Sequence, residues 1–536
     1  MEALLIVVYS ICGIYMLLDL KHDIHMLQQN SYRIKRFWRY LEHNDLSSIW
    51  RLCDLAMLFI IFSRLLLPSV SAVFVAIYCL SKIFLIQRRK FKKPLVFTRR
   101  VIRIYIVAGC VFVGLFLWAI FKLGFIPETD IYYSGPVLVL AILLLMSIFS
   151  WLIVIIAVVL LMPVEKSINN HYINDAKKIL KNMPELKVIG ITGSYGKTST
   201  KHYLERILSE HFDVLMTPGS YNTPMGVVRT IREQMKPFYS VFICEMGAKQ
   251  KGDIKEISDI VHPEIGIVTS VGPMHLETFK TIDNVRETKF ELIDSLPPDG
   301  FAVVNNDFEE CEKRKVDNVK CIRYSAEGDV KQNAEMVYAD RISYTINGTD
   351  FTVELPGGKS LNLHTPLLGK CNVSNLLAAI IVADKLGMSE EEIKRGVASI
   401  NQVEHRLSIK KTAGGVTIID DAFNSNPTGS KMALEVLSQF KDGRRIIVTP
   451  GMIELGDKEY QLNKELGKCI GENSDIAIIV GSYNRESLLD GISTADNKNV
   501  EINVVDNFNE AQRLLSGILR SGDTVLYEND LPDTFK

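Results

Sequence analysis

The stretch that decides the fold is VIGITGSYGKT, residues 188–198. Its apolar start, Val188 to Thr192, is typical of a buried strand, and residues 199–209 have the pattern of a helix. Glycines in the loop between them let backbone N–H groups approach phosphates, while Lys197 reaches the outer phosphates and Thr198 can bind Mg²⁺. The stretch therefore predicts a phosphate loop, although Ile191 stands where the strict G-x-x-x-x-G-K-[ST] pattern begins.

Two further polar residues follow apolar strands downstream of this loop. Glu245 comes after the run 241–244, and His275 comes a few residues after the run 265–270. Because the carboxyl ends of parallel strands meet at one edge of a sheet, we expect both near the phosphate loop. Taken singly, Glu245 has a simpler interpretation as a solvated acid and His275 as a hydrogen-bonded polar residue. Three polar strand ends in one sheet favour a metal site.

The rest of the chain alternates strand and helix patterns to its end, which predicts α/β domains with mainly parallel sheets. We expect a P-loop ATPase-like central domain over residues 186–402. From residue 403 to 536 the alternation begins again with a strand at 416–419, which predicts a small Rossmann-like domain.

Upstream of residue 166 the composition changes completely. The chain has 536 residues, 47% of them hydrophobic, and the apolar excess lies in runs near 2–20, 53–87, 104–121 and 136–162. A span needs about 20 apolar residues, so we predict an α-helical membrane domain of about four to five helices over residues 1–165. The first run is interpreted as a retained span, with a buried soluble helix as the alternative. Residues 166–185 should form a polar connecting helix.

Charge sets the expected orientation in the plasma membrane. Residues 81–103 carry nine lysines and arginines and no acid, so this loop should be cytoplasmic. Residues 21–51 are also basic, and an even number of crossings must separate two cytoplasmic loops. We therefore expect 53–87 to be a helical hairpin turning near Pro68, with five spans, an outside N-terminus and cytoplasmic catalytic domains; four spans is the rival count. The basic loop could also bind an anionic lipid or a diphosphate headgroup.

Global charge and cysteine content exclude other classes of protein. With 61 lysines and arginines against 62 acids, the chain has no overall charge that favours nucleic acid as a partner. Nine cysteines without a C-x-x-C pair indicate reduced thiols, as in a cytosolic or membrane setting.

Five motifs, taken in order, resemble the Mur ligase family. They are TGSYGKT (192–198), EMG (245–247), MHLE (274–277), GKCNVSN (369–375) and DDAFNSNP (420–427). Together with GMIELG (451–456), the last resembles the branch of the family that adds D-alanyl-D-alanine to a UDP-N-acetylmuramoyl tripeptide. The resemblance extends from residue 186 to about 525.

The resemblance implies ATP-dependent amide bond formation with two Mg²⁺ ions. A carboxylate would take the γ-phosphate to give an acyl phosphate, and an amine would then displace phosphate. Lys197, His275 and Lys289 would be catalytic, and Thr198, Glu245, His275 and Lys289 would hold metal. Lys289 would act as a CO₂-derived carbamate; without the family context it reads as a surface lysine.

The resemblance also implies a nucleotide site and a substrate loop. Asn372 and Asn375 would contact the adenine, and Arg406 would contact the phosphates. Asp421 would bind the ribose, and Asn424 would line the same cleft. The implied nucleotide-binding residues in the phosphate loop are Thr192, Gly193, Ser194, Tyr195, Gly196, Lys197, Thr198 and Ser199. Asn222 and Thr223 would lie near the carboxylate substrate, with an ordinary turn as the alternative for Asn222.

Two departures from the family pattern bear on the substrates. The family's UDP-sugar-binding domain is replaced by the apolar segment, so the acceptor carboxylate could be lipid-linked. Residues 527–530, YEND, stand where the related branch carries a basic Lys-Gly-Ser type motif. An acidic pocket would disfavour the carboxylate of D-alanyl-D-alanine.

Several functions remain open at this point. The leading hypothesis is a membrane-embedded ligase joining an amino acid or peptide amine to a peptidoglycan-like or lipid-linked glycan precursor. A second is a ligase that makes a poly-amino-acid or modifies another polymer. A third is a transporter or sensor regulated by nucleotide, and a fourth is a subunit whose substrate site another protein supplies. Other envelope-synthesis enzymes are candidate partners.

Overall fold

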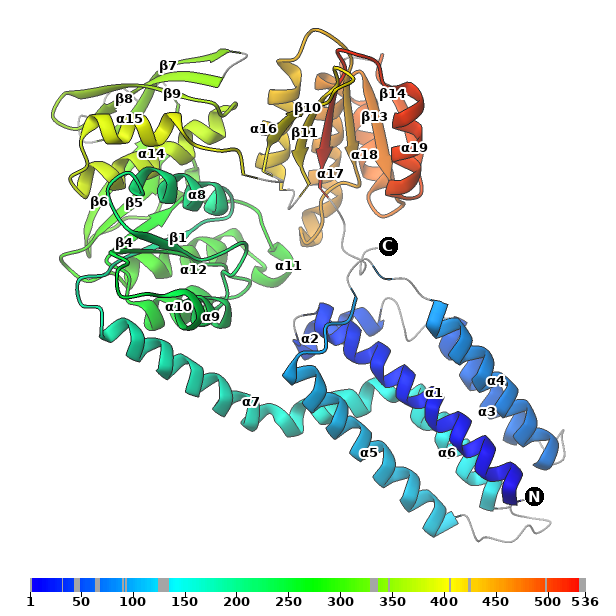
Figure 1. Cartoon of the computed structure of the whole chain (residues 1–536). Helices are drawn as coiled ribbons and strands as arrows, with labels where there is room; N and C mark the ends of the chain where they lie inside the picture. The colour runs from blue at the N-terminus through cyan, green and yellow to red at the C-terminus, as the bar shows by residue number, and fades with distance from the viewer. Residues whose placement is uncertain are drawn as a thin grey trace. The chain divides into compact units, whose positions relative to one another are not determined.

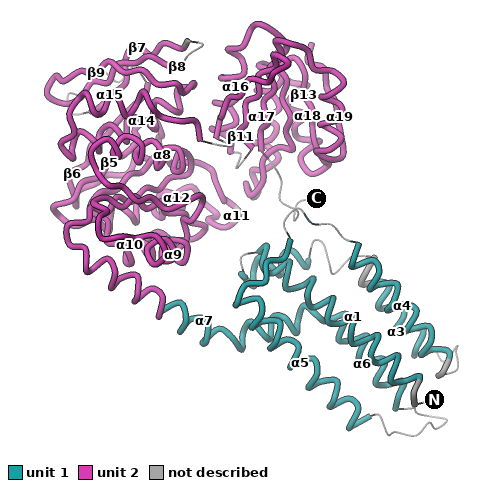
Figure 2. The backbone as a smooth tube through the Cα atoms, viewed as in Figure 1, with its two compact units in different colours: residues 1–170, 532–534 teal, residues 171–531, 535–536 magenta. Residues whose placement is uncertain are grey.

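The chain divides into two compact units, residues 1–170 and 171–531 (Figure 2). The computed structural model describes residues 2–30, 32–42, 49–62, 68–88, 91, 94–123, 135–327, 336–345, 348–403, 406–422, 426–496 and 499–529.

The first unit is helical throughout its described part (Figure 1). Apolar residues from its helices form one core, which includes Leu20, Val75 and Val154. The helices are α1 (Glu2–Gln29), α2 (Ile34–Tyr40), α3 (Ile49–Phe62), α4 (Pro68–Arg88), α5 (Arg99–Leu123), α6 (Gly135–Ile148) and α7 (Ser150–Lys181).

Within the described residues, four helices are long and apolar enough to cross a membrane: α1, α4, α5 and α7. Helices α3 and α6 are apolar but have only 14 residues each. At 1.5 Å per residue they are about 21 Å long, shorter than a hydrocarbon core of about 30 Å. The segment expected to be a hairpin does contain two helices, and the second begins at Pro68, where proline suits the first helical turn.

The apolar run at residues 136–162 does not form one uninterrupted helix. A turn at Phe149 separates α6 from α7. The Ser150 hydroxyl at this break lies within hydrogen-bond distance of two carboxylates on α1, at 3.0 Å from Asp19 and 2.5 Å from Asp23. Buried carboxylates that accept from this serine give a polar reason for the break, which hydropathy alone does not show. Helix α7 then continues past Pro163 to Lys181, so the connecting segment extends the same helix.

The second unit contains two sheets, which define a middle lobe and a C-terminal lobe. In the described middle lobe the strand order is β2-β3-β1-β4-β5-β6-β7-β8-β9, parallel as far as β7 and antiparallel from β7 to β9. The strands are β1 (Lys187–Thr192), β2 (Val214–Met216), β3 (Val241–Glu245), β4 (Ile265–Val268), β5 (Phe301–Asn305), β6 (Lys320–Ser325), β7 (Val337–Thr345), β8 (Gly348–Leu355) and β9 (Lys359–Thr365).

Helices pack on both faces of the middle sheet (Figure 1). They are α8 (Lys197–Leu208), α9 (Pro224–Gln234), α10 (Asp253–Val261), α11 (Leu276–Phe279), α12 (Ile282–Asp294), α13 (Glu309–Glu312), α14 (Lys370–Lys385) and α15 (Glu390–Ala398).

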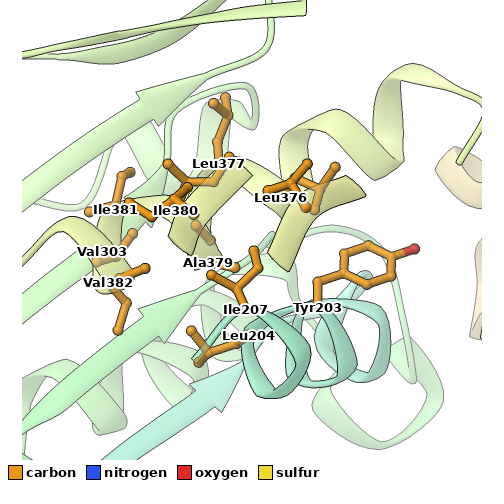
Figure 3. Close-up of a cluster of buried hydrophobic side chains, with 14 of the residues drawn as sticks. Tyr203, Leu204, Ile207, Val303, Leu376, Leu377, Ala379, Ile380, Ile381 and Val382 are labelled. Carbon is orange, nitrogen blue, oxygen red and sulfur yellow. The ribbon is translucent and has the colours of Figure 1, made fainter. Parts of the chain in front are cut away.

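The core between α8 and α14 fixes the position of the phosphate loop. Figure 3 shows Leu204 and Ile207 of α8 gathered with Leu376 and Ile380 of α14. All four side chains are fully buried, and truncating such a residue to alanine typically costs about 2–5 kcal/mol. This packing holds α8 firmly, and the loop that precedes α8 is held with it.

The C-terminal lobe has the strand order β10-β11-β15-β12-β13-β14 in its described part, parallel except for β10. This confirms the predicted Rossmann-like domain. The strands are β10 (Ser408–Lys411), β11 (Thr417–Asp421), β12 (Arg445–Thr449), β13 (Ile476–Val480), β14 (Glu501–Val505) and β15 (Thr524–Glu528). The helices are α16 (Pro427–Ser438), η2 (Gly456–Lys458), α17 (Glu459–Asn473), α18 (Arg485–Ser493) and α19 (Phe508–Ile518).

Candidate active site

The phosphate loop runs from the end of β1 to the start of α8. Gly196 has φ +79° at the helix N-terminus, and a Cβ there would lie 2.3 Å from the Asn375 side-chain oxygen. Glycine is therefore required on two grounds, because it allows the left-handed conformation and leaves room for Asn375. The N-terminus of α8, with its unpaired N–H groups, opens into this loop, which suits an anion.

The end of β4 holds the loop in place. The Ser194 amide donates to the Ser270 carbonyl at 2.9 Å, and the Tyr195 amide donates to the Ser270 hydroxyl at 2.6 Å. The Ser194 hydroxyl donates to the Gly272 carbonyl at 3.1 Å. These bonds shape the loop before any ligand binds, so little reordering is needed for phosphate to enter.

Lys197 is half-buried beside the loop. Its ammonium donates to the carbonyl oxygens of Gly193 at 2.6 Å and Ser194 at 3.2 Å. Burial lowers the pKa of Lys197 to about 8, with Arg406 adding to the effect and Glu245 opposing it. A phosphate would supply the opposite charge that favours the ammonium form.

Glu245 is the last residue of β3, and its carboxylate contacts Lys201, Thr198 and Asn222. Its side chain is 2% exposed and pairs with Lys201 at 3.0 Å. The Thr198 hydroxyl donates to Glu245 at 3.2 Å, and the Asn222 amide donates to it at 3.0 Å. Burial alone would raise the pKa of Glu245, but Lys201, Lys197 and the bond from Asn222 outweigh it and lower the pKa. The carboxylate is therefore ionised and turned toward Thr198.

His275 and Lys289 lie on the other side of the loop. His275 has φ +53° just before α11, and its Nδ1 hydrogen-bonds the Glu454 carboxylate of the C-terminal lobe. Burial lowers the pKa of His275, an effect that Glu454 opposes. Lys289, on α12, is buried, and burial together with the charge of Lys197 holds the pKa of its amine well below the usual value. Lys289 is therefore inside the site, not on the surface.

The described residues contain no group of three or more histidine, cysteine, aspartate or glutamate side chains placed to hold a metal ion. Mg²⁺ is usually held by one or two carboxylates plus substrate phosphates, and not by a complete protein cage. Glu245 with the neighbouring Thr198 hydroxyl fits that pattern. The donor set therefore suits a Mg²⁺ ion that arrives with a nucleotide.

Helix α14 brings both predicted adenine residues close to α8. Asn375 accepts a hydrogen bond from Thr200 at 3.2 Å and lies against Gly196. Asn372 accepts from the Tyr203 hydroxyl at 2.7 Å and donates to the Leu368 carbonyl at 2.8 Å. Asn375 is thus placed at the phosphate loop, whereas Asn372 joins α14 to α8 further along that helix.

Arg406 lies in the segment that leads into the C-terminal lobe, and Asp421 is the last residue of β11 in that lobe. Arg406 lies close enough to Lys197, Glu245 and Asp421 to interact with their charges. Asp421 accepts from the Leu407 amide at 3.1 Å, and burial raises its pKa to about 6 despite Arg406. Asn424 lies outside the described residues.

A cavity of about 470 Å³ opens beside this edge. It is lined by residues of α8 from Thr198 to Arg206, by residues 219–220 and by residues 400–403 and 406. Its lining includes His202, Arg206, Ser220 and Arg406. Space for a ligand therefore adjoins the predicted metal ligand Thr198.

Comparisons with known proteins agree with this geometry. A model described as Mur ligase middle domain matches residues 191–383, and one described as Mur ligase, glutamate ligase domain matches residues 405–527. UDP-N-acetylmuramoyl-tripeptide–D-alanyl-D-alanine ligase of Mycobacterium tuberculosis (strain CDC 1551 / Oshkosh) is 31% identical over 366 residues, which are 64% of this chain and 70% of that protein. The chain belongs to the Mur ligase family.

As a Mur ligase, the protein is an ATP-dependent carbon–nitrogen ligase. The ligase of the same name from Bacillus subtilis (strain 168) is 28% identical over 64% of this chain and 72% of that protein. The crystal structure of MurF from Acinetobacter baumannii has a TM-score of 0.60 and 27% identity, and covers 68% of this chain and 77% of that one. MurF from Thermotoga maritima in complex with ADP, at 24% identity and a TM-score of 0.59, shares the fold.

The sequence motifs of this Mur ligase did not predict the contacts of two residues, Lys201 and Glu454. Lys201 is fully buried, pairs with Glu245 and donates to the Gly219 carbonyl at 2.6 Å. Its position one helical turn after Lys197 could have indicated that it faces the same edge. Glu454 gave no such signal, because 179 residues separate it from His275.

Two other predicted residues have structural partners. The Thr223 hydroxyl accepts from the Gly226 amide at 3.3 Å and so caps α9. Glu528, in the segment expected to form an acidic pocket, is fully buried and accepts from the Ser430 hydroxyl at 2.5 Å. Glu528 therefore does not present an exposed charge, which weakens the argument against a substrate carboxylate.

Proposed function

We propose that this Mur ligase is embedded in the plasma membrane and joins an amine to a carboxylate on a cell-envelope precursor, through an acyl phosphate. The observation that carries the proposal is the gathering of Lys197, Thr198, Glu245, His275 and Lys289 around one sheet edge. Nucleotide sensing alone has no need for a buried lysine and a histidine beside the metal ligands. Amide formation needs both charge neutralisation and water exclusion.

Each side chain of the site would have a role that follows from its chemistry. Lys197 and the N-terminus of α8 would neutralise the outer phosphates of ATP. Arg406 would add positive charge from the segment that leads into the C-terminal lobe. Thr198 and Glu245 would hold one Mg²⁺ ion, and His275 with modified Lys289 a second. When bound, these ions supply charge that brings the carboxylate and the phosphate together.

Lys289 would become a carbamate before turnover. Only a neutral amine attacks CO₂, forming an N–C bond and losing a proton to solvent. Burial and the nearby charge of Lys197 favour the neutral amine. The product is an anionic group in a position where metal ions would stabilise it.

The helical unit supports a membrane-bound acceptor. Four helices of the described chain are long enough to span a bilayer, and large apolar side chains such as Phe59, Ile77 and Phe121 are exposed. In water such a surface would aggregate, whereas lipid covers it. We propose that the basic loops place the ligase unit in the cytoplasm and that the acceptor is lipid-linked. Holding both partners in one membrane raises their effective concentration.

A reconstitution assay tests this proposal. Detergent-purified full-length protein would be given Mg²⁺-ATP, bicarbonate, a panel of amines that includes D-alanyl-D-alanine, and either UDP-linked muramoyl peptides or a lipid-linked precursor extract. We expect phosphate release and an amide product, identified by mass spectrometry, with the lipid fraction. Turnover with the soluble precursor alone would contradict the lipid-linked acceptor and leave the ligase intact. No product with any combination would contradict the ligase proposal itself.

A further inference from the structure

The motif GMIELG at residues 451–456 supplies Glu454, whose contact with His275 has no role in the proposed function. It follows β12 and leads into η2 of the C-terminal lobe. Its Glu454 has φ +63°, and its partner His275 in the middle lobe has φ +53°. Non-glycine residues rarely adopt this left-handed conformation, and they keep it where the surroundings hold them. Two such residues therefore meet at one contact.

The contact fixes how the imidazole can be protonated. The Nδ1 atom of His275 lies within hydrogen-bond distance of a Glu454 carboxylate oxygen. An ionised carboxylate only accepts, so Nδ1 must carry the hydrogen. In the neutral ring, Nε2 then has the free lone pair, which is the form that binds a metal ion or accepts a hydrogen bond.

Other charged groups near the ring do not compete for Nδ1. Lys249 and Lys289 face His275 closely enough to oppose its protonation. Ammonium groups cannot accept a hydrogen bond, so they do not fix the tautomer. Among the described residues, Glu454 supplies the carboxylate that contacts this ring. The His275 side chain is 19% exposed and that of Glu454 is 25% exposed, so water only partly screens the pair.

We infer that Glu454 is a positioning residue that holds His275 as its Nδ1–H tautomer, with Nε2 directed to the reaction site. The orienting role follows from the contact alone, whereas the use of Nε2 as a metal ligand rests on the proposed function. Because Glu454 and His275 belong to different lobes, His275 is held as the Nδ1–H tautomer only while the two lobes are in contact. The C-terminal lobe thus controls a group of the middle lobe.

The tautomer can be measured without metal, nucleotide or substrate. Full-length protein labelled with ¹⁵N-histidine would be recorded by long-range ¹H–¹⁵N spectroscopy, with His275→Gln assigning the ring. We expect the Nδ1–H form in the wild type and its replacement by the Nε2–H form in Glu454→Ala. Glu454→Gln, whose amide can donate or accept, should give a mixture. Glu465→Gln is the matched control, because Glu465 is an exposed acid of the same lobe that accepts from the Gln461 amide at 3.1 Å.

The outcomes separate this inference from the proposed function. An unchanged His275 tautomer in Glu454→Ala, with the other nine histidine signals intact, overturns the positioning role. A changed tautomer in both Glu454→Ala and Glu465→Gln also overturns it, because the effect would then be unspecific. Mn²⁺ binding with ATP, followed by electron paramagnetic resonance, is the second readout. We expect it to weaken about 10–100-fold in Glu454→Ala. A changed tautomer with unchanged Mn²⁺ affinity would keep the positioning role and remove His275 from the metal site.

Discussion

Each of the two units buries a lysine–carboxylate pair. In the middle lobe Lys201 pairs with Glu245 at 3.0 Å, with side chains 0% and 2% exposed. In the helical unit Lys82 pairs with Asp54 at 3.4 Å, with side chains 5% and 0% exposed. Both pairs are costly to desolvate, so each should have a reason to exist.

The surroundings of the two pairs differ. Glu245 lies at the end of a strand, beside the Thr198 hydroxyl and the phosphate loop, where a ligand can enter. Asp54 lies among α1, α3 and α4 and accepts hydrogen bonds from Tyr15 at 3.3 Å and Tyr78 at 2.5 Å. The first pair keeps a charged group ready at an open edge, while the second joins helices in an apolar setting. Burial of an ion pair alone therefore does not identify a catalytic site.

The largest effect on stability is expected when the first pair is broken. Lys201→Met leaves the Glu245 charge buried without its main partner, which should destabilise the ligase unit by about 3–5 kcal/mol. Labelling of the buried Cys244 thiol during urea titration follows this unit directly, because Cys244 precedes Glu245 in β3.

Two variants sharpen that test. Adding Glu245→Gln to Lys201→Met should restore much of the loss, since no uncompensated charge remains. Lys187→Met breaks the exposed pair with Glu264 and should cost less than about 1 kcal/mol. Equal losses in Lys201→Met and Lys187→Met would contradict the account of the buried pair.

The next largest effect is expected on catalysis. Lys289→Ala should lower product formation by at least about 100-fold while ATP still binds, because the proposed carbamate can no longer form. Phosphate release and equilibrium nucleotide binding measure the two quantities separately. Unchanged turnover would remove Lys289 from the mechanism.

The same lysine predicts a pH dependence. Its folded-state pKa is lowered, so between that pKa and the unfolded value near 10.4 the unfolded chain binds more protons. The stability of the ligase unit should therefore rise with pH in this window. Lys289→Met should flatten the rise, and an unchanged slope in urea titrations would contradict a neutral buried amine.

A smaller effect is expected from the second pair. Lys82→Met should destabilise the helical unit by about 1–2 kcal/mol, the range of polar contacts between helices in membranes. All four tryptophans, Trp38, Trp50, Trp118 and Trp151, lie in the first unit, so their fluorescence reports on that unit alone. Cys244 protection and ATP binding should not change. Loss of ATP binding would mean that the two units are coupled more closely than the comparison implies.

The smallest effect concerns Thr223. Thr223→Ala removes the N-cap of α9 and should cost about 1 kcal/mol, with little change in the KM of the carboxylate substrate. Asn222→Ala should instead lower turnover, because Asn222 donates to Glu245. A large KM increase in Thr223→Ala would restore the substrate role that the family motif implies.

The sequence predicted those parts of the site that depend on local pattern. The phosphate loop, Glu245 and His275 each follow an apolar strand, and parallel strands bring such ends together regardless of loop length. Lys289 needed the family resemblance, because nothing in its own segment shows that the side chain is buried.

Long-range pairing was not predictable in the same way. The antiparallel strands β7 to β9 extend the middle sheet, and no motif marked that extension. The break at Phe149 depends on Asp19 and Asp23, more than 120 residues earlier. Likewise Glu454 meets His275 only after two separate sheets have formed. In each case the deciding partner is distant in sequence and carries no periodic signal.

The most direct test of the central claim is the fate of oxygen from the acceptor carboxylate. The full-length ligase would be supplied with lipid-linked precursor labelled with ¹⁸O at both carboxylate oxygens, together with Mg²⁺-ATP and amine. An acyl phosphate leaves one labelled oxygen in the released phosphate and the other in the amide. We expect one ¹⁸O per phosphate for each amide formed. Amide formation with unlabelled phosphate would contradict the account.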